Sequence, residues 1–436
     1  MRAMFNFLTY VLIRTAAFPF EWMPYSWIHA IGKGLGLFLF YVMPHYRKRT
    51  LSNLALAKEL KLNHFEIRRI GKEAFQNLAT VCLEYPRLFK EKTLSSLIKC
   101  ENPETADSIR KEGKGIIFYC AHLSNWEMLF IEGTNRMKGI AIGKPIKNKF
   151  LYRWVVSIRE KYGGTIISQK NAIKEGLRAL KKGIFVGIVG DQGMPNSSYS
   201  SSFLGRDAFT TTAPALLAYR TNCPMMFAEI LRKNGGYQIR YSDPVWPNLE
   251  EPLEKEVPRM MDQVLFLLQE RIKKRPGDWL WQHNRWKQQT PKNVYKRFRH
   301  DAICLILPEK REQVLELLPH LPTLREIYPK EFLLVFAPNA CKDLALIQAD
   351  ETVFYKKIEE TLIQDYRFKF MLNFTNFTPI KSHYLRLSAL EVLNLSNLYK
   401  LAKNYLPKGN YTLSDVFKRA LTRPGTLWEK ETVHAR

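Results

Sequence analysis

The stretch that decides the fold is Gly113-Lys114-Gly115-Ile116-Ile117-Phe118-Tyr119-Cys120-Ala121-His122-Leu123-Ser124-Asn125-Trp126-Glu127. Its apolar run, opened by glycines, predicts a strand that is buried on both faces of a sheet. Ser124-Asn125 and the apolar residues that follow predict the start of a helix. We therefore expect His122 at the carboxyl end of a strand, where open α/β sheets place their ligands.

Two interpretations of His122 and Glu127 are open on these residues alone. Ser124-x-x-Glu127 has the spacing of a capping box, in which the carboxylate satisfies a free backbone N–H. Alternatively, Glu127 holds the imidazole and fixes its tautomer, while His122 takes a proton from an attacking hydroxyl. The second interpretation requires His122 to lie before the helix, because five helical residues turn two side chains about 140° apart.

Further motifs follow this stretch in order: Arg159-Glu160-Lys161-Tyr162-Gly163-Gly164, Gly190-Asp191-Gln192-Gly193-Met194-Pro195, Phe203-Leu204-Gly205-Arg206, Thr210-Thr211-Thr212-Ala213-Pro214 and Pro276-x-x-Trp279-x-Trp281-x-His283-x-Arg285-Trp286-Lys287. With His122-x4-Glu127 they resemble the lysophospholipid acyltransferase superfamily. Within it, the chain is similar to the late acyltransferases of lipid A biosynthesis, which transfer lauroyl or myristoyl chains. The resemblance covers about residues 1–290.

The resemblance implies an O-acyltransferase with a glycerol-3-phosphate acyltransferase-like fold, which is an α/β fold with a mixed sheet flanked by helices. It implies that His122 is the general base and that Glu127 orients it. It also implies that a thioester of acyl carrier protein or coenzyme A is the co-substrate, without a cofactor or a metal, and that a lipid A precursor is the acceptor. The substrate-binding residues would be Asn125, Lys144, Arg159, Asp191 and Gln192.

Several of these assignments have alternatives. Lys144 stands where the family usually has a Tyr-Arg-Pro triplet, and its ammonium lacks the bidentate fork of arginine, which puts a phosphate contact in doubt. Arg159 is either a solvated helical residue or a substrate ligand. Asp191 ends a predicted strand, so it lies either in the site with His122 or orders the loop 193–202. That loop is long enough to cover the site.

The charge of the chain favours anionic partners. Its 436 residues suffice for two domains, and its net charge is +26. We find no zinc-finger, RNA-recognition or helix-turn-helix pattern, so acidic lipids and an acidic carrier protein are favoured over nucleic acid. A basic run is interpreted as a linker and docking face: Arg271, Lys273, Lys274, Arg275, Arg285, Lys287, Lys292, Lys296, Arg297 and Arg299.

The six cysteines have no Cys-x-x-Cys spacing, which favours a reducing compartment over a disulfide or metal framework. Cys120 would point to the same side of its strand as His122, so an acyl-cysteine intermediate is one reading. A small cysteine buried in a strand is the favoured reading.

The N-terminal residues 1–46 are interpreted as a membrane anchor. Residues 4–20 are apolar but short, whereas Pro24–Pro44 has about the length of a spanning helix and precedes Arg47-Lys48-Arg49. The anchor either spans the membrane once or lies at its interface, and the alternative is a buried hairpin of a soluble protein. No cleavage site supports a signal peptide. The anchor and the resemblance together predict the cytoplasmic face of a bacterial inner membrane.

The remainder divides into an acyltransferase domain, 47–290, and a small α/β domain of unknown role, 291–436. The tryptophans of 279–286 suit either a membrane interface or a packed closing segment. In the second domain, apolar runs alternate with helical patterns, which predicts a largely parallel sheet, and no nucleotide-binding motif is present. The predicted strands are 116–120, 139–142, 165–167, 183–190, 225–231, 237–241, 302–307, 332–336, 352–355 and 368–374.

The predicted function is acyl transfer to a hydroxyl of a lipid A precursor. The nearest alternative is an acyltransferase that acts on a lysophospholipid or another glycolipid. An alternative of another class is a non-catalytic basic protein that binds membranes or nucleic acid.

Overall fold

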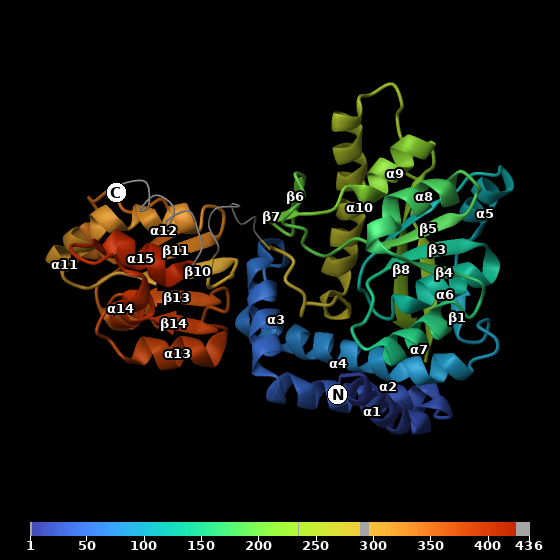
Figure 1. Cartoon of the computed structure of the whole chain (residues 1–436), viewed down its shortest axis with the longest axis horizontal. Helices are drawn as coiled ribbons and strands as arrows, with labels where there is room; N and C mark the ends of the chain where they lie inside the picture. Colours follow the sequence, from blue (N-terminus) through green and yellow to red (C-terminus); the bar gives the residue numbers. More distant parts are fainter. Residues whose placement is uncertain (1, 234, 288–295, 424–436) are drawn as a thin grey trace.

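The computed structural model describes residues 2–233, 235–287 and 296–423. Two separate sheets organise the chain, one on each side of the segment 288–295 (Figure 1). The predicted boundary between residues 290 and 291, and Lys292 of the basic run, lie outside the described residues.

The first sheet is mixed, as predicted. Its strand order is β1-β9-β8-β2-β5-β3-β4, and all neighbours are parallel except β8 and β9. All four residues of β2 are buried at the centre of the sheet, which explains its unbroken apolar sequence. The strands are β1 Ile98–Cys100, β2 Ile117–Cys120, β3 Gly139–Gly143, β4 Thr165–Ser168, β5 Phe185–Val189, β8 Met225–Lys233 and β9 Gly236–Tyr241.

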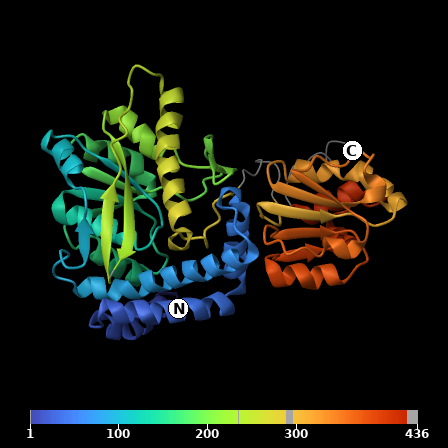
Figure 2. The ribbon, with the colours of Figure 1, turned by 180° about the vertical axis from the view of Figure 1, so that it is seen from behind.

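Helices flank this sheet, and the long helix α4 runs beneath it in both ribbon views (Figures 1 and 2). An asparagine capping box at Asn63 starts α4. The helices of this part are α3 Pro44–Leu56, α4 His64–Lys90, α5 Glu104–Lys111, α6 Glu127–Arg136, α7 Lys149–Arg159, α8 Ala172–Leu180, α9 Ala213–Thr221 and α10 Leu253–Lys274.

Helix α2 (Tyr25–Val42) packs closely along α4. A Cβ at Gly32 would lie 2.4 Å from Thr80 Oγ1, and one at Gly36 would lie 2.3 Å from the Cα of Gln76. Only glycine permits α2 to approach α4 this closely. Gly32 and Gly36 lower the helix propensity of α2, but they allow it to pack on α4. One face of α2 therefore belongs to the core beside the first sheet.

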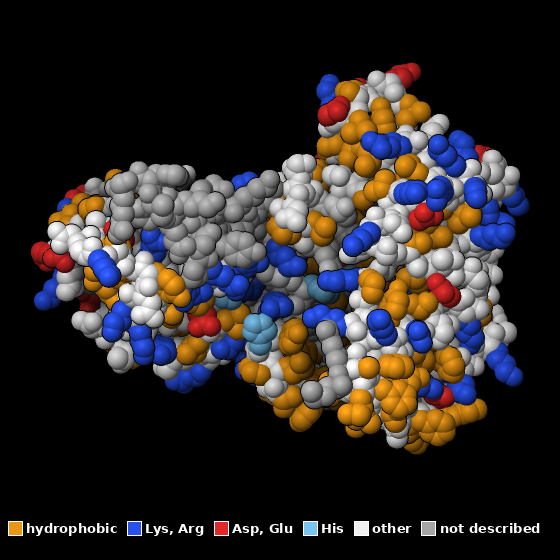
Figure 3. Space-filling model, viewed as in Figure 1, with side chains coloured by type: hydrophobic (Ala, Val, Ile, Leu, Met, Phe, Trp, Pro, Cys, Tyr) orange, Lys and Arg blue, Asp and Glu red, His pale blue; other side chains and the backbone are white. Residues whose placement is uncertain are grey.

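The outer side of α1 (Arg2–Ala17) and α2 is apolar and exposed, and hydrophobic side chains gather along this edge (Figure 3). Residues Ala3–Glu21 are long and apolar enough to cross a membrane, whereas α2 passes that test only together with α3, across a bend of 96°. The sequence pointed to Pro24–Pro44 instead. In the structure, the glycine face of α2 packs on α4, so only the other side of this helix is exposed. Exposed apolar residues here include Phe5, Leu8, Leu12, Trp22, Trp27 and Phe38.

The loop predicted at 193–202 ends in a hairpin. β6 (Ser200–Phe203) pairs with β7 (Arg206–Phe209) in an antiparallel ladder. β6 was not predicted, because its three consecutive serines have no strand pattern.

The second sheet has five strands in the order β12-β11-β10-β13-β14, and every pair is parallel. The order matches that of doubly wound nucleotide-binding folds without their glycine-rich motif. The residues 384–404 have a helical sequence pattern, but β14 separates them into two helices. The elements are β10 Ala302–Ile306, α11 Arg311–Leu317, α12 Pro322–Ile327, β11 Phe332–Pro338, β12 Glu351–Tyr355, β13 Phe370–Asn373, α13 Pro379–Leu387, β14 Glu391–Leu393, α14 Leu395–Ala402 and α15 Leu413–Leu421.

Candidate active site

His122 and Asp191 meet at the carboxyl ends of two paired strands. β2 and β5 are parallel neighbours in which Cys120 pairs with Val189, so the residues two positions later emerge side by side. The His122 ring donates from Nδ1 to Asp191 Oδ1 at 2.7 Å, and its backbone N–H donates to Oδ2 at 2.9 Å. Trp279 Nε1 donates to Oδ2 at 2.7 Å. Three donors therefore hold one carboxylate.

These donors decide the charge of Asp191. Burial by itself raises the pKa of the carboxyl, but the charge of His122 and the hydrogen bonds from His122 and Trp279 outweigh burial and hold the pKa below its usual range. Asp191 is thus ionised at neutral pH. It stabilises the Nδ1–H tautomer of His122 and the imidazolium that would form when Nε2 takes a proton.

A glutamine amide joins His122 to a second histidine. Gln192 Nε2 lies 3.5 Å from His122 Nε2 and 3.2 Å from His283 Nε2, and an amide nitrogen has two N–H donors for two such acceptors. Burial, with the charge of His122, lowers the pKa of His283 to about 4, so His283 is neutral at pH 7. His283 therefore fixes the amide that stands beside the basic nitrogen of His122.

Glu127 binds Arg159, which corrects the expectation that Glu127 orients His122. Arg159 Nε donates to Glu127 Oε2 at 2.7 Å, and Nη2 donates to Oε1 and, at 3.2 Å, to Tyr85 Oη. The reason is positional: Glu127 opens α6 and faces α7, whereas Asp191 leaves the strand next to His122. Although burial opposes the charge of Arg159, Glu127 raises the pKa of its guanidinium.

The capping-box interpretation of Ser124 and Glu127 is also wrong. Helix α6 begins at Glu127, with Trp126 as its N-cap and without a side-chain capping bond. Ser124 has a φ of 45°, and its backbone N–H donates to the carbonyl of Asp278 at 2.9 Å. The left-handed turn at Ser124 folds the chain between His122 and the helix.

Asn125 has a structural contact where substrate binding was predicted. Its side chain is fully buried, and Nδ2 donates to Glu84 Oε2 at 2.7 Å. Glu84 lies on α4 and also contacts His29 Nε2 at 2.6 Å. Asn125 thus ties the turn after His122 to the helices beneath the sheet.

A cavity of about 570 Å³ opens beside His122. This volume lies in the usual range for a small-molecule site, about 300–1,000 Å³. Its walls are mainly apolar, with polar groups from His122, Glu127, Lys144, Arg159 and Gln192. Five of the seven residues predicted from the sequence therefore face one cavity, with Asp191 buried directly behind His122.

Cys120 also lines the cavity, but it is a poor nucleophile. Its thiol is buried, and burial raises its pKa, with the charge of Asp191 as a further cause. The sulfur donates to the carbonyl of Ile188 at 3.6 Å. Since the thiolate is the reactive form, this geometry fits a buried strand cysteine.

The basic run 271–299 does not form one exposed face. Arg271 is 3% exposed and binds Glu229 and Asp278. Arg285 is 1% exposed and donates to Phe209 O and Thr210 Oγ1. Lys296 is 1% exposed and pairs with Glu331. Lys287 is the exposed member nearest the site. Burial and the charges of Arg49 and Lys144 lower the pKa of its ammonium.

The tryptophan segment is packed into the protein. Trp279, Trp281 and Trp286 are at most 2% exposed, which decides between the two interpretations of this segment. We call residues 279–287 the closing strap. The contacts of Trp279 and His283 with the site were not predicted, although both residues belong to the motif that begins at Pro276. These residues lie more than 150 positions after His122, and no local sequence pattern indicates a contact over that separation.

Within the described ranges, no group of three or more His, Cys, Asp or Glu side chains is arranged to hold a metal ion.

Comparison with known proteins connects this geometry to a family. The family model for bacterial lipid A biosynthesis acyltransferases matches residues 3–288, which confirms the predicted resemblance. No curated protein gives a significant match. The matched region contains the His122–Asp191 pair, the Glu127–Arg159 pair and the closing strap. The chain therefore belongs to the family of bacterial lipid A biosynthesis acyltransferases.

Proposed function

We propose that this protein transfers a fatty acyl chain from the thioester of an acyl carrier protein, or of coenzyme A, to a hydroxyl of a lipid A precursor. The observation that carries the proposal is the hydrogen bond from His122 Nδ1 to Asp191. This bond leaves Nε2 as the basic nitrogen at the wall of an apolar cavity. Family membership supports acyl transfer as the reaction.

The reaction follows from that arrangement. The acceptor hydroxyl gives its proton to His122 Nε2 while its oxygen attacks the carbonyl carbon of the thioester. The new C–O bond forms, and the carbonyl π electrons move onto oxygen. When the tetrahedral intermediate collapses, the C–S bond breaks and the sulfur receives the proton from His122. Asp191 stabilises the intervening imidazolium, so no covalent enzyme intermediate is required.

The developing oxyanion requires donors, and two side chains supply them. Arg159 lines the cavity with its guanidinium fixed by Glu127 and Tyr85. Gln192 holds an amide N–H 3.5 Å from His122 Nε2, and this N–H becomes available to the oxyanion once Nε2 has taken the proton of the acceptor. Donors already held in place stabilise charge without reorganising during the reaction. In this proposal Glu127 is a positioning residue for Arg159.

The acyl chain would occupy the apolar part of the cavity, which is lined by Phe130, Ala141, Phe185, Gly187 and Ile188. The mixed sheet with His122 at a strand end supports a glycerol-3-phosphate acyltransferase-like scaffold. A lipid tail requires an apolar wall, and the hydroxyl that forms the ester requires a base. The same cavity provides the apolar wall and His122.

Membrane and carrier contacts are further parts of the proposal. The exposed apolar face of α1 and α2 supports attachment to the cytoplasmic face of the inner membrane. The charges of Arg49 and Lys287 act on His283, and the charge of Lys144 acts on Lys287. In Figure 3, Lys and Arg side chains gather near the middle of the view, between the two parts of the molecule. Such a cluster would attract the anionic groups of the acceptor or an acidic carrier protein.

The test is an acyl-transfer assay with the purified full-length chain. Acyl carrier protein and coenzyme A thioesters are each offered with a lipid A precursor, a lysophospholipid or no acceptor, and products are identified by mass spectrometry. We expect a lipid A product with the wild type and none with His122→Ala. Transfer only to lysophospholipid would replace the acceptor. Binding to liposomes or DNA without transfer to any acceptor would overturn the enzyme proposal.

A further inference from the structure

A buried lysine connects the C-terminal domain to the acyltransferase domain. Lys369 immediately precedes β13 and is 2% exposed. Its Nζ donates to Asn53 Oδ1 at 2.8 Å, to Asn284 Oδ1 at 2.9 Å and to Asp301 Oδ1 at 2.7 Å. An ammonium has three donors, so all are used. Because a buried cation without acceptors is costly, Lys369 holds these three side chains in place.

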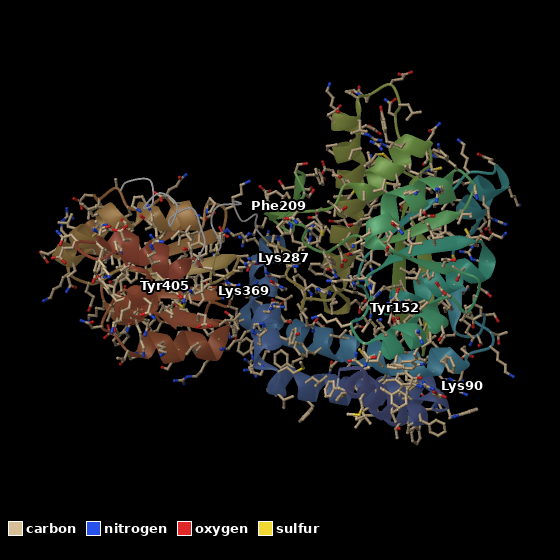
Figure 4. All side chains as sticks on the ribbon, in the orientation of Figure 1. Lys90, Tyr152, Phe209, Lys287, Lys369 and Tyr405 are labelled. Carbon is tan, nitrogen blue, oxygen red and sulfur yellow. The ribbon has the colours of Figure 1, made fainter. Side chains whose placement is uncertain are left out.

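Two of these acceptors connect directly to the closing strap. Asn53, on α3, donates from Nδ2 to the carbonyls of Trp281 at 2.8 Å and His283 at 2.5 Å. Asn284 is itself the residue after His283. Lys369 therefore holds the strap at His283 from two directions, once through Asn53 and once directly. In Figure 4, Lys369 and Lys287 both lie where the two domains meet.

The strap in turn contacts the site at three points. Trp279 Nε1 donates to Asp191 at 2.7 Å, the backbone N–H of Leu280 donates to the carbonyl of His122 at 3.1 Å, and His283 Nε2 lies 3.2 Å from the Gln192 amide. A displacement of the strap would therefore disturb Asp191, Gln192 and the backbone of His122 at the same time. Misplacement of a reacting group by about 1 Å can cost about 10²-fold in rate.

The C-terminal domain contacts the acyltransferase domain through the amino ends of its parallel strands. Asp301 and Lys369 precede β10 and β13, Lys58 pairs with Glu351 at the start of β12, and Lys48 donates to the carbonyl of Ala389 before β14. Open α/β sheets bind ligands at the opposite, carboxyl ends. The contact with the acyltransferase domain therefore uses the amino ends of the strands and leaves the carboxyl ends, where such sheets bind ligands, uncovered by this contact.

We propose that the C-terminal domain positions the acyltransferase site, with Lys369 as the positioning residue that fixes His283, and through it Gln192, beside His122. This role rests on the proposed acyl transfer. It also assigns a purpose to a domain that the family match at residues 3–288 does not include.

The first experiment measures turnover of the full-length chain. Lys369→Met alone would leave the buried Asp301 without its ion-pair partner, so the variant is Lys369→Met/Asp301→Asn. We expect kcat to fall about tenfold, with KM for donor and acceptor within about twofold of the wild type. The matched control is Lys58→Met, which removes an interdomain ion pair of 3.0 Å that does not reach the strap. It should leave both parameters within about twofold.

The second experiment does not depend on activity. The pKa of His283, about 4 in the intact structure, is followed by NMR of labelled histidine and assigned with His283→Gln. In Lys369→Met/Asp301→Asn we expect this pKa to rise toward the ordinary value of about 6.5, because a loosened strap exposes the ring to water. If the wild type transfers no acyl group, the proposed function fails, yet the titration still tests the link from Lys369 to His283.

A second variant covers failure of the double variant to fold. Asn53→Ala removes the donor to the carbonyl of His283 and leaves Lys369 paired with Asp301. It should change kcat and the titration of His283 in the same directions. An Asn53→Ala protein, or a folded double variant, with wild-type kcat and an unchanged His283 titration would overturn the positioning role.

Discussion

The carboxylate of Asp191 accepts two hydrogen bonds from one residue, His122, through the ring Nδ1 at 2.7 Å and the backbone N–H at 2.9 Å. The two bonds fix both the orientation of the ring and the turn that carries it. His122 cannot rotate its Nε2 away from the cavity without giving up the contact with Asp191. The general base is therefore oriented before a substrate arrives.

Replacing the base should remove most of the activity. His122→Gln keeps a polar side chain of similar size but has no nitrogen that takes up a proton. We expect kcat to fall by about 10²- to 10⁴-fold, the usual contribution of general-base catalysis, with the melting temperature nearly unchanged. Single-turnover assays with a saturating thioester would measure the loss. A kcat within threefold of the wild type would contradict the assignment of His122 as the base.

Asp191→Asn should separate orientation from charge. The amide preserves the shape of the carboxylate but no longer stabilises the imidazolium, and its NH₂ group competes with His122 Nδ1–H. We expect kcat to fall by about 10²-fold or more, with little change in KM. Glu127→Gln serves as the comparison, since Glu127 binds Arg159 instead. Loss of the orienting carboxylate should move the acidic limb of the pH–rate profile to lower pH, because the imidazolium is less stabilised. If Glu127→Gln moved this limb and Asp191→Asn did not, the orienting carboxylate would be Glu127.

Glu127 and Arg159 should behave as a coupled pair. Removing one partner leaves a buried charge alone, which typically costs about 3–5 kcal/mol. Glu127→Gln and Arg159→Met should each lower the free energy of unfolding strongly. The double variant should lose less than the sum, as measured by denaturant titration in a double-mutant cycle. Additive losses would show that the pair does not interact. All three variants should lose activity because the cavity loses its fixed guanidinium.

Filling the cavity should shorten the preferred acyl chain. A Cβ on Gly187 would meet Ala141 Cβ at 3.7 Å, an ordinary contact, so Gly187→Val fits the strand while it narrows the cavity. We expect the ratio of long-chain to short-chain transfer to fall, measured by competition between thioesters of different length. Gly34→Val, on the open side of α2, is the control and should leave the ratio unchanged. An unchanged ratio in Gly187→Val would place the acyl chain elsewhere.

His283 should make the protein sensitive to mild acid. Its pKa is about 4 when folded and about 6.5 when unfolded, so between these values the unfolded chain binds a proton that the folded protein does not. Stability therefore falls as the pH falls from about 6.5 toward 4, by at most about 2 kcal/mol at pH 5. Urea unfolding at pH 7 and pH 5 should show a smaller loss for His283→Gln. An equal loss in both proteins would assign the sensitivity to other groups.

Local pattern was sufficient for much of the architecture. The apolar runs at β2, β5, β10 and β11 predicted strands because a strand buried on both faces has to be continuously apolar. The same reasoning placed His122 and Asp191 at strand ends and therefore near one another. It did not detect β6, whose serines are held in a strand only by pairing with β7.

By itself, the sequence determined the strand that ends at His122, the mixed and parallel sheets, the family and five polar residues of the cavity, because each depends on neighbours along the chain. Only the tertiary structure decided which carboxylate meets the imidazole, which glycines of α2 touch α4, and that Lys369 reaches the strap around His283. These contacts join residues as many as 316 positions apart. The packing of the sheets and helices sets the geometry of these contacts, and local sequence patterns do not predict that packing.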